Sequence, residues 1–264
     1  MNETNYADIN AKTIDKWVDN GWEWGVPISH DDYLSARNGT WSVLLSPQKP
    51  VPKNWFAPLL RDGRLDGVKL LGLAAGGAQQ MPVFAALGAI CTVLDYSDRQ
   101  IESERAFSLR EGYEIDIIKA DMSKPLPFLD GNFDLIFHPV SNCYVEDVQH
   151  VWNECFRILK TGGVLLAGMD NGINYLFDDG APLRIVNKLP YNPLKDPCLL
   201  KKSAGSGVQF SHTMEEQIGG QLKAGFTLTD LHEDSDKPQA GKPGICEYYP
   251  QYVATRAVKK QREK

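Results

Sequence analysis

From residue 68 onward, short apolar runs alternate with helical patterns, and this alternation constrains the fold more than any other feature of the sequence. Residues 68–73 form an apolar run that is closed by a loop of small residues, 74–78, and a helix is expected over 79–87. A second apolar run covers 90–96, and the next helix opens at Ser97. Strands that alternate with helices through short loops predict a parallel sheet with helices on both faces.

The same rhythm continues along the rest of the chain. Two capping boxes, Ser97 with Gln100 and Thr213 with Glu216, mark helix starts, and a helix with one apolar face over 148–159 is expected to end at Gly162-Gly163. The remaining strands are expected over 114–120, 133–137, 164–169, 226–231 and 248–258, the last two as an antiparallel pair. We therefore predict an α/β fold: a doubly wound, mostly parallel, Rossmann-like sheet of seven strands with helices on both faces and an N-terminal cap.

The chain divides into a first quarter and a main part. Residues 1–66 contain five of the six tryptophans among polar and proline-rich loops, which favours an N-terminal cap with helical and aromatic character. Residues 67–264 are expected to form the main domain. Within it, 170–210 lose periodicity, and a connection of that length is more often a functional lid than an idle loop.

The aromatic residues of the cap have two interpretations. In the first, Tyr6, Trp17, His30 and Trp41 line a pocket for an apolar or cationic ligand. In the second, the large apolar side chains dock the cap onto the sheet. We favour docking for Trp17 and Trp55, and Trp41 stays undecided.

Composition excludes several classes of protein. The formal net charge of −6 disfavours nucleic-acid binding, which needs a concentrated basic surface. Five cysteines without a Cys-x-x-Cys pair suit reduced thiols, and neither a disulfide framework nor a metal site is expected. No apolar run is long enough for a membrane span and the first residues do not resemble a signal peptide, so we expect a cytoplasmic protein.

Two carboxylates follow successive predicted strands. Asp95 ends the strand over 90–96, and Asp121 comes directly after Ala120 at the end of the next. Because ligands of open parallel sheets bind at the carboxyl ends of the strands, both acids are expected on one rim, where they suit the ribose and the adenine of a nucleoside. The loop 74–78 lacks the three-glycine spacing of a pyrophosphate site, which disfavours a nucleotide-linked oxidoreductase.

These segments resemble the class I S-adenosylmethionine methyltransferases, with motifs in order over about residues 66–170. The resemblance rests on five stretches: 68–79 (VKLLGLAAGGAQ), 93–97 (VLDYS), 119–122 (KADM), 133–137 (FDLIF) and 159–164 (LKTGGV). It implies S-adenosylmethionine as cofactor and S-adenosylhomocysteine as product. The cofactor-binding positions that it implies are Gly72, Ala74, Gly76, Gly77, Gln79, Asp95, Tyr96, Ser97, Ala120, Asp121, Met122 and His138.

The loop departs from the family pattern at its first position. The family usually has an acidic residue where this chain has Gly72, so another residue must contact the ammonium group of the cofactor or its affinity is lower. Ala74 and Ala78 also replace common glycines.

The polar stretch 138–147 follows the fourth strand, where the family places groups next to the transferring methyl. His138 is the first candidate for a general base, because its ordinary pKa lies near neutrality. Asn142 and Tyr144 are candidates for orienting the acceptor. The alternative for His138 and Asn142 is that they satisfy backbone groups near a strand end.

We expect transfer of a methyl group to a small-molecule acceptor, carried out by a monomer or homodimer. Two alternatives stay open: a catalytically silent protein of this fold that binds the cofactor or a partner, and an RNA methyltransferase. The chain lacks the Asn/Asp-Pro-Pro-Tyr/Phe motif typical of methyltransferases acting on the amino groups of nucleic-acid bases. The sequence does not identify the acceptor or the atom that is methylated.

Overall fold

The computed structural model describes residues 5–178, 183–238 and 244–261, and it is built on a seven-stranded sheet in the order β3-β2-β1-β4-β5-β7-β6. Neighbouring strands are parallel except β7, which is antiparallel to both β5 and β6. The strands are β1 Lys69–Leu73, β2 Ile90–Asp95, β3 Asp116–Lys119, β4 Phe133–His138, β5 Leu159–Asp170, β6 Thr227–Asp234 and β7 Tyr252–Val258. The predicted fold, including the antiparallel final pair, is confirmed.

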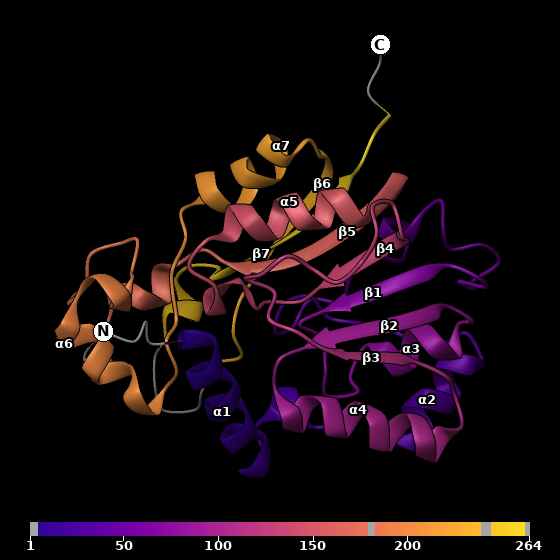
Figure 1. Cartoon of the computed structure of the whole chain (residues 1–264), viewed down its shortest axis with the longest axis horizontal. Coiled ribbons are helices and arrows are strands. Elements are labelled where there is room, and N and C mark those ends of the chain that lie inside the picture. Colours follow the sequence, from indigo (N-terminus) through magenta and orange to yellow (C-terminus); the bar gives the residue numbers. More distant parts are fainter. Residues whose placement is uncertain (1–4, 179–182, 239–243, 262–264) are drawn as a thin grey trace.

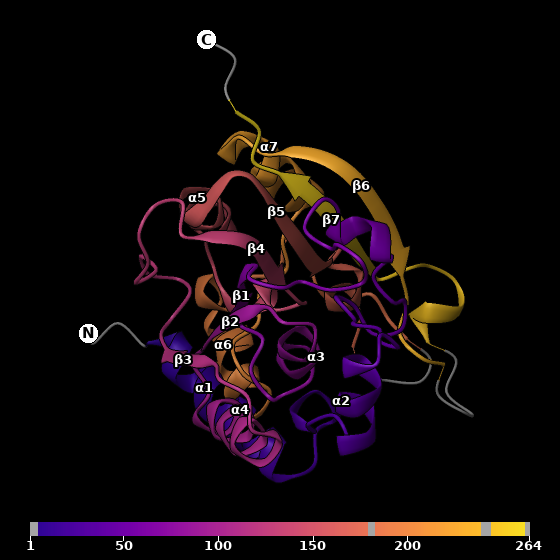
Figure 2. The same cartoon turned by 90° about the vertical axis from the view of Figure 1, so that its right-hand side faces the viewer.

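Helices cover both faces of this sheet (Figures 1 and 2). One face carries α2, α3 and α4, and the other carries α5 and α7. The strands supply alternate side chains to the two layers, because successive residues of a strand point to opposite faces: Leu70 packs in the first core and Leu71 in the second. The helices are α1 Tyr6–Asp19, α2 His30–Arg37, α3 Met81–Ala86, α4 Asp98–Glu111, α5 Val148–Ile158, α6 Pro197–Lys202 and α7 Gly220–Ala224.

Three local predictions need correction. Gly162-Gly163 do not end α5, because the chain turns extended at Leu159 and enters β5 at once, so both glycines lie inside the strand. Ser97 accepts a hydrogen bond from the Gln100 backbone N–H, but the Gln100 side chain donates to the Trp24 carbonyl (3.2 Å), so the capping box is only half formed.

The third correction concerns the helix predicted after Thr213. The capping box of Thr213 and Glu216 is present, with the Glu216 carboxylate accepting from the Thr213 backbone N–H at 2.8 Å. The chain then forms a π-helical turn over Glu215–Gly219 before α7 begins at Gly220. The expected single helix is therefore divided into a π-helical turn and a short α-helix.

The N-terminal residues pack in two places. Helix α1 lies along α4 below the sheet (Figure 1), whereas the segment around Leu45 crosses the sheet at β5, where a Cβ on Gly168 would overlap the Leu45 carbonyl. Trp55 docks as predicted: it is 2% exposed, and its indole N–H donates to Asp230 at 2.7 Å. Residues from this quarter of the chain thus share the hydrophobic core of the α2–α4 face.

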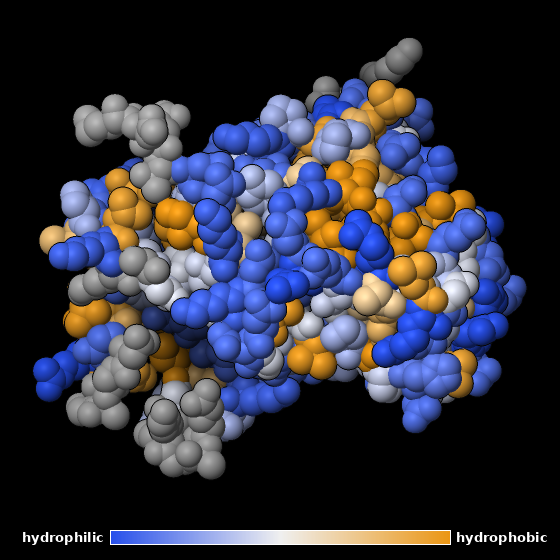
Figure 3. Space-filling model, turned by 60° about the horizontal axis from the view of Figure 1, so that its bottom comes forward, coloured by the Kyte–Doolittle hydropathy of each residue, from blue (hydrophilic) through white to orange (hydrophobic). Residues whose placement is uncertain are grey.

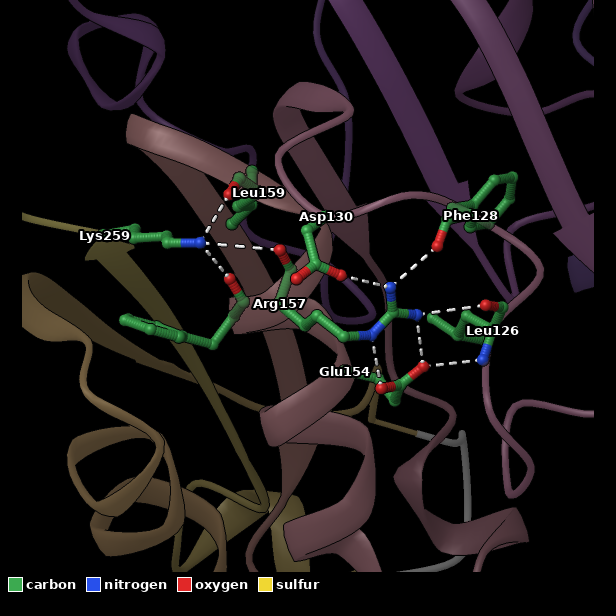
Figure 4. A network of polar contacts seen from close by, with 8 residues as sticks. Leu126, Phe128, Asp130, Glu154, Arg157, Leu159 and Lys259 are labelled. Atoms are coloured by element: carbon green, nitrogen blue, oxygen red, sulfur yellow. Dashed lines mark hydrogen bonds and ion pairs between the residues drawn. The ribbon is translucent and has the colours of Figure 1, made fainter.

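At the amino end of the strands, Arg157 ties the loop before β4 to the end of α5 (Figure 4). Its guanidinium donates to both carboxylate oxygens of Glu154 (2.7 and 2.8 Å), to Asp130 (2.9 Å) and to the carbonyls of Leu126 and Phe128. Glu154 also accepts from the Leu126 backbone N–H at 2.6 Å. Every charge in this network therefore has a partner.

The surface seen from the side of α1 and α4 is mainly hydrophilic, with hydrophobic side chains in separate groups (Figure 3). Among the described residues, no helix is long and apolar enough to cross a membrane. The described residues also contain no group of His, Cys, Asp and Glu side chains that could hold a metal ion.

Candidate active site

A cavity of about 750 Å³, here called the main cavity, opens at the carboxyl ends of the central strands. It is lined by one residue from each of four strand ends: Asp95 (β2), Ala74 (after β1), Pro139 (after β4) and Asp170 (β5). This edge is where open α/β sheets bind their ligands.

The loop after β1 is held against Asp95. One carboxylate oxygen of Asp95 accepts the Gly76 N–H and the other accepts the Ser97 N–H, both at 3.0 Å. A Cβ on Gly76 would lie 2.8 Å from the Gln100 Cβ and 3.0 Å from Asp95 Oδ2, so only glycine permits this approach. Burial raises the pKa of Asp95, and the surrounding backbone N–H groups partly offset the rise.

Two alanines in this loop adopt a backbone conformation that favours glycine. Ala74 has φ 49° and Ala78 has φ 55°. The Ala78 N–H donates to Glu104 of α4 at 2.8 Å, and burial raises the pKa of Glu104 to about 7. Alanine thus adopts positive φ at two positions of the loop, and Glu104 of α4 bonds the loop at Ala78.

A second, smaller cavity of about 60 Å³ lies under α1 and is here called the side cavity. It shares Ala74, Asp95 and Tyr144 with the main cavity. Five further predicted cofactor-binding residues line it: Tyr96, Ser97, Ala120, Asp121 and Met122. The cavity therefore gathers the residues expected around adenine.

Helix α1 is bonded to the rim of the side cavity. Asp8 accepts the Tyr96 hydroxyl at 2.7 Å, and Asp15 accepts the Ser97 hydroxyl at 2.6 Å. Asp15 also accepts the Arg99 backbone N–H at 3.0 Å. These contacts hold α1 over the ends of β2 and β3.

Three predicted cofactor residues, Gly72, Gly77 and His138, do not line either cavity. Gly72 lies behind the wall, where a Cβ would overlap the Met81 sulfur, so a buried thioether occupies the space beside the missing acid. Gly77 faces Gln100 and the Trp24 carbonyl. The predicted cofactor residues Ala74, Gly76 and Gln79 do line the main cavity.

His138 and Asn142 form a buried polar chain that also lies outside the cavity linings. One ring nitrogen of His138 bonds the Leu73 carbonyl and the other lies 2.9 Å from the Asn142 side chain, which in turn bonds Gln217 at 2.8 Å. Burial lowers the pKa of His138 and so favours the neutral ring. Both residues make hydrogen bonds near the ends of β1 and β4. Tyr144, the third catalytic candidate, lines both cavities.

Tyr6, His30 and Trp41 are not brought together and do not line the main cavity. Tyr6 packs edge-on against Phe210, His30 pairs with Glu111 at 2.7 Å on the surface, and Trp41 packs on Phe56.

A different aromatic set lines the cavity instead: Trp17, Trp22 and Trp24. Docking was the wrong expectation for Trp17, because α1 presents it to the main cavity beside Trp22, at a ring separation of 5.4 Å. The sequence shows that Trp17 lies on the apolar face of a helix, but it does not show what that face packs against.

The opposite wall comes from the end of β5, the insertion, the segment after β6 and β7. It contains residues that the sequence analysis missed: Asp170, Tyr175, Tyr191, Asp236 and Tyr252. Asp170 could have been found, since it ends a strand as Asp95 does. Tyr175 and Tyr191 could not, because the insertion shows no periodicity. Tyr252 falls in the strand predicted over 248–258, but no local signal shows that this strand reaches the cavity.

Asp170 stands out chemically within this wall. Its side chain is 6% exposed; Oδ1 accepts the Gly172 N–H at 2.9 Å, and Oδ2 has no hydrogen-bond partner. Burial raises the pKa of Asp170 to about 6. Among the described lining residues, four are aspartates and none is Lys, Arg or His; the aspartates are Asp95, Asp170, Asp178 and Asp236.

The residues present fit a nucleoside cofactor with a cationic sulfonium. Asp95 supplies an acceptor-only carboxylate at the end of β2, and Gly76 keeps the loop backbone close to it. The acidic lining complements positive charge, and Met122 adds an apolar contact in the side cavity.

Comparisons with known proteins agree with this fit. A family model described as a methyltransferase domain matches residues 71–167. YbaJ, an uncharacterized methyltransferase of Bacillus subtilis, is 39% identical over 258 residues, which cover 95% of this chain and 97% of the relative. The sterol 24-C-methyltransferase erg6 of Aspergillus fumigatus is 27% identical over 192 residues, 71% of this chain and 46% of that protein. An S-adenosylmethionine-dependent methyltransferase structure from Mesorhizobium loti shares the fold, with TM-score 0.57 and 20% identity over 73% of this chain and 91% of that one.

The B. subtilis relative matches nearly the full length of both chains, and the family model covers the chain from β1 into β5. The chain belongs to the class I S-adenosylmethionine-dependent methyltransferases, enzymes that use S-adenosylmethionine as cofactor.

Proposed function

We propose that the enzyme methylates a small molecule bound beside the cofactor in the main cavity. The observation that carries this proposal is the continuity of the cavity, which extends from Asp95 at the end of β2 to Asp170 and Tyr175 at the other side. A volume of about 750 Å³ lies in the range of small-molecule sites.

In this proposal the cofactor lies over the ends of β1 and β2. Asp95 accepts hydrogen bonds from the ribose, and Ala74, Gly76 and Gln79 contact the methionine part. The adenine enters the side cavity between Tyr96, Ser97, Ala120, Asp121 and Met122, under α1. The bound cofactor supplies an electrophilic methyl group on its sulfonium.

The residues of the chain then act mainly by alignment and exclusion of water. Tyr144 lines both cavities and is placed to contact the acceptor where they join. His138 and Asn142 position the ends of β1 and β4 rather than serving as base and acceptor ligand, because neither lines a cavity. The main cavity's four aspartates disfavour RNA as acceptor, since they repel phosphates.

Calorimetric titration with S-adenosylmethionine and S-adenosylhomocysteine tests this proposal. We expect both ligands to bind the wild type, and Asp95→Ala to lose at least about 100-fold in affinity, because a charged acceptor of two ribose hydroxyls is removed. Asp116→Ala is the matched control, since Asp116 is an exposed acid at the amino end of β3, beside β2.

Asp95→Asn keeps the shape of the side chain but removes its charge, so it serves as a second variant if Asp95→Ala does not fold. Absence of binding by the wild type, or wild-type affinity in a folded Asp95→Ala protein, would contradict the proposed site.

A further inference from the structure

The unpartnered oxygen of Asp170 points to the chemistry of the acceptor. A buried carboxylate oxygen without a hydrogen bond is costly, and native proteins rarely keep one without a functional reason. Asp170 Oδ2 is buried and lacks a partner, and the residue, which is only 6% exposed, is one of those that line the main cavity. The side chain is therefore positioned for a donor that enters the cavity.

No neighbouring group supplies that donor. Tyr175 donates its hydroxyl to Gln209 at 2.9 Å, and Tyr252 donates to Asp236 at about the same distance. His212 is close enough for its charge to lower the pKa of Asp170, but its Nε2 bonds the carbonyls of Asn142 and Val145.

The other ionisable groups that interact with Asp170 are neutral acids at physiological pH. Burial raises the pKa values of Cys143, Tyr144, Tyr175 and Tyr252. None of them can offset a negative charge; among these groups only His212 lowers the pKa of Asp170, and it does not bond Oδ2.

The strand order separates Asp170 from the nucleoside site. Asp95 ends β2 and Asp170 ends β5, and β1 and β4 lie between these strands. With about 4.8 Å between neighbouring strands, β5 lies about 14 Å from β2. Asp170 therefore faces the acceptor side of the cavity.

The charge of the lining excludes one class of acceptor and favours another. Asp95, Asp170 and Asp236, with no basic residue among the described lining, oppose a carboxylate or phosphate. Tyrosine rings line the same wall, and aromatic faces together with a carboxylate stabilise an ammonium group.

We propose that the acceptor is an amine with an apolar body and that Asp170 Oδ2 holds its nitrogen. This inference rests on the proposed function and names the substrate class of the same cavity. The ammonium donates an N–H to Oδ2, with Tyr144, Tyr175 and Tyr252 around it. The N–H bond then breaks toward Oδ2, the proton passes to the carboxylate, and the electron pair stays on nitrogen as the lone pair that methylation requires.

Three matched probes test the proposal: 2-phenylethylamine, 2-phenylethanol and 3-phenylpropionate, which present an ammonium, a hydroxyl and a carboxylate on a similar body. Each is titrated calorimetrically into the protein saturated with S-adenosylhomocysteine. We expect the amine to bind at least about tenfold more tightly than the alcohol, as for a charge-assisted hydrogen bond at a buried site, and the carboxylate not to bind.

Asp170→Asn is expected to abolish the preference for the amine while the affinity for S-adenosylhomocysteine stays within about twofold, because asparagine keeps the acceptor for the Gly172 N–H. Asp236→Asn is the matched control: it lines the same cavity but already accepts the Tyr252 hydroxyl. We expect it to retain the preference.

The outcomes separate the two proposals. If S-adenosylhomocysteine binds but the wild type prefers the alcohol or the carboxylate, the amine assignment is overturned and the cofactor site stands. An equal loss of preference in Asp170→Asn and Asp236→Asn would overturn the role of Asp170. If S-adenosylhomocysteine does not bind at all, the proposed function itself fails.

Discussion

Buried carboxylates at the two ends of the parallel strands differ in whether they have hydrogen-bond partners. At the amino end, Arg157 holds the pKa of the Glu154 carboxyl below its usual range, and both groups are fully paired (Figure 4). At the carboxyl end, burial raises the pKa of Asp170 to about 6, and one of its oxygens has no partner.

The contrast separates charge that stabilises the fold from charge that is kept for a ligand. The Arg157 network closes on itself, with two carboxylates and two carbonyls around one guanidinium, so it has no capacity left for binding. The Asp170 wall is incomplete in the free protein. Unpaired polar groups of this kind lower stability, and enzymes retain them where function requires it.

Replacement of Arg157 should disrupt the network at the amino end of the strands and lower the unfolding free energy more than any other change considered. Arg157→Met leaves Glu154 buried without its cation, which is expected to cost about 3–5 kcal/mol of unfolding free energy. The measurement is thermal unfolding, with an expected loss of about 10 °C in Tm. Lys124→Met, an exposed change in the same loop, should shift Tm by no more than about 2 °C. Similar Tm values for the two variants would show that the network does not stabilise the protein.

The Asp170→Asn variant should change stability in the opposite direction. The folded-state pKa of about 6 lies above the usual 3.8, so the native protein binds this proton more tightly than the unfolded chain, and stability falls as pH rises through about 6. Replacement by neutral asparagine should therefore stabilise the protein by about 2–3 kcal/mol at pH 7.5 and by only about 0.5 kcal/mol near pH 4. Unfolding at the two pH values measures the difference, and a destabilised variant at pH 7.5 would contradict this account.

The third effect concerns the packing behind the cavity wall. A Cβ on Gly72 would overlap the buried Met81 sulfur, so Gly72→Ala should cost about 1–2 kcal/mol of stability. Gly205→Ala is the control, because a Cβ there meets nothing within 4 Å. If Gly72→Ala unfolds at the wild-type temperature, the thioether does not fill the position of the family's acid as tightly as the structure indicates.

Local signals in the sequence predicted most of the fold. Apolar runs, capping residues and the small-residue loop depend on neighbouring residues, and they placed the strands and the rim acids Asp95 and Asp121 correctly in order. The start of β5 was misplaced because a glycine pair signals a helix end in isolation, whereas pairing between Leu159 and Phe133 extends the strand through it.

The lining of the cavity was predicted less well, for a physical reason. Its walls combine segments far apart in the chain: Trp17 on α1, Tyr144 after β4, Asp170 on β5 and Tyr252 on β7. Periodicity shows that such residues face something, but not what they face. His138 illustrates the limit: its chemistry suggested a base, but the sequence could not show that the ring is buried and bonded to the Leu73 carbonyl.

By itself, the sequence determined the alternation of strands and helices, the small-residue loop and the acid at the end of the second strand, because these depend on local backbone preferences and side-chain periodicity. Only the tertiary structure decided that Asp170, a residue of the cavity lining, is left with a buried oxygen that has no partner. Burial and hydrogen-bond satisfaction are set by every segment packed around a side chain, and no stretch of sequence contains that information.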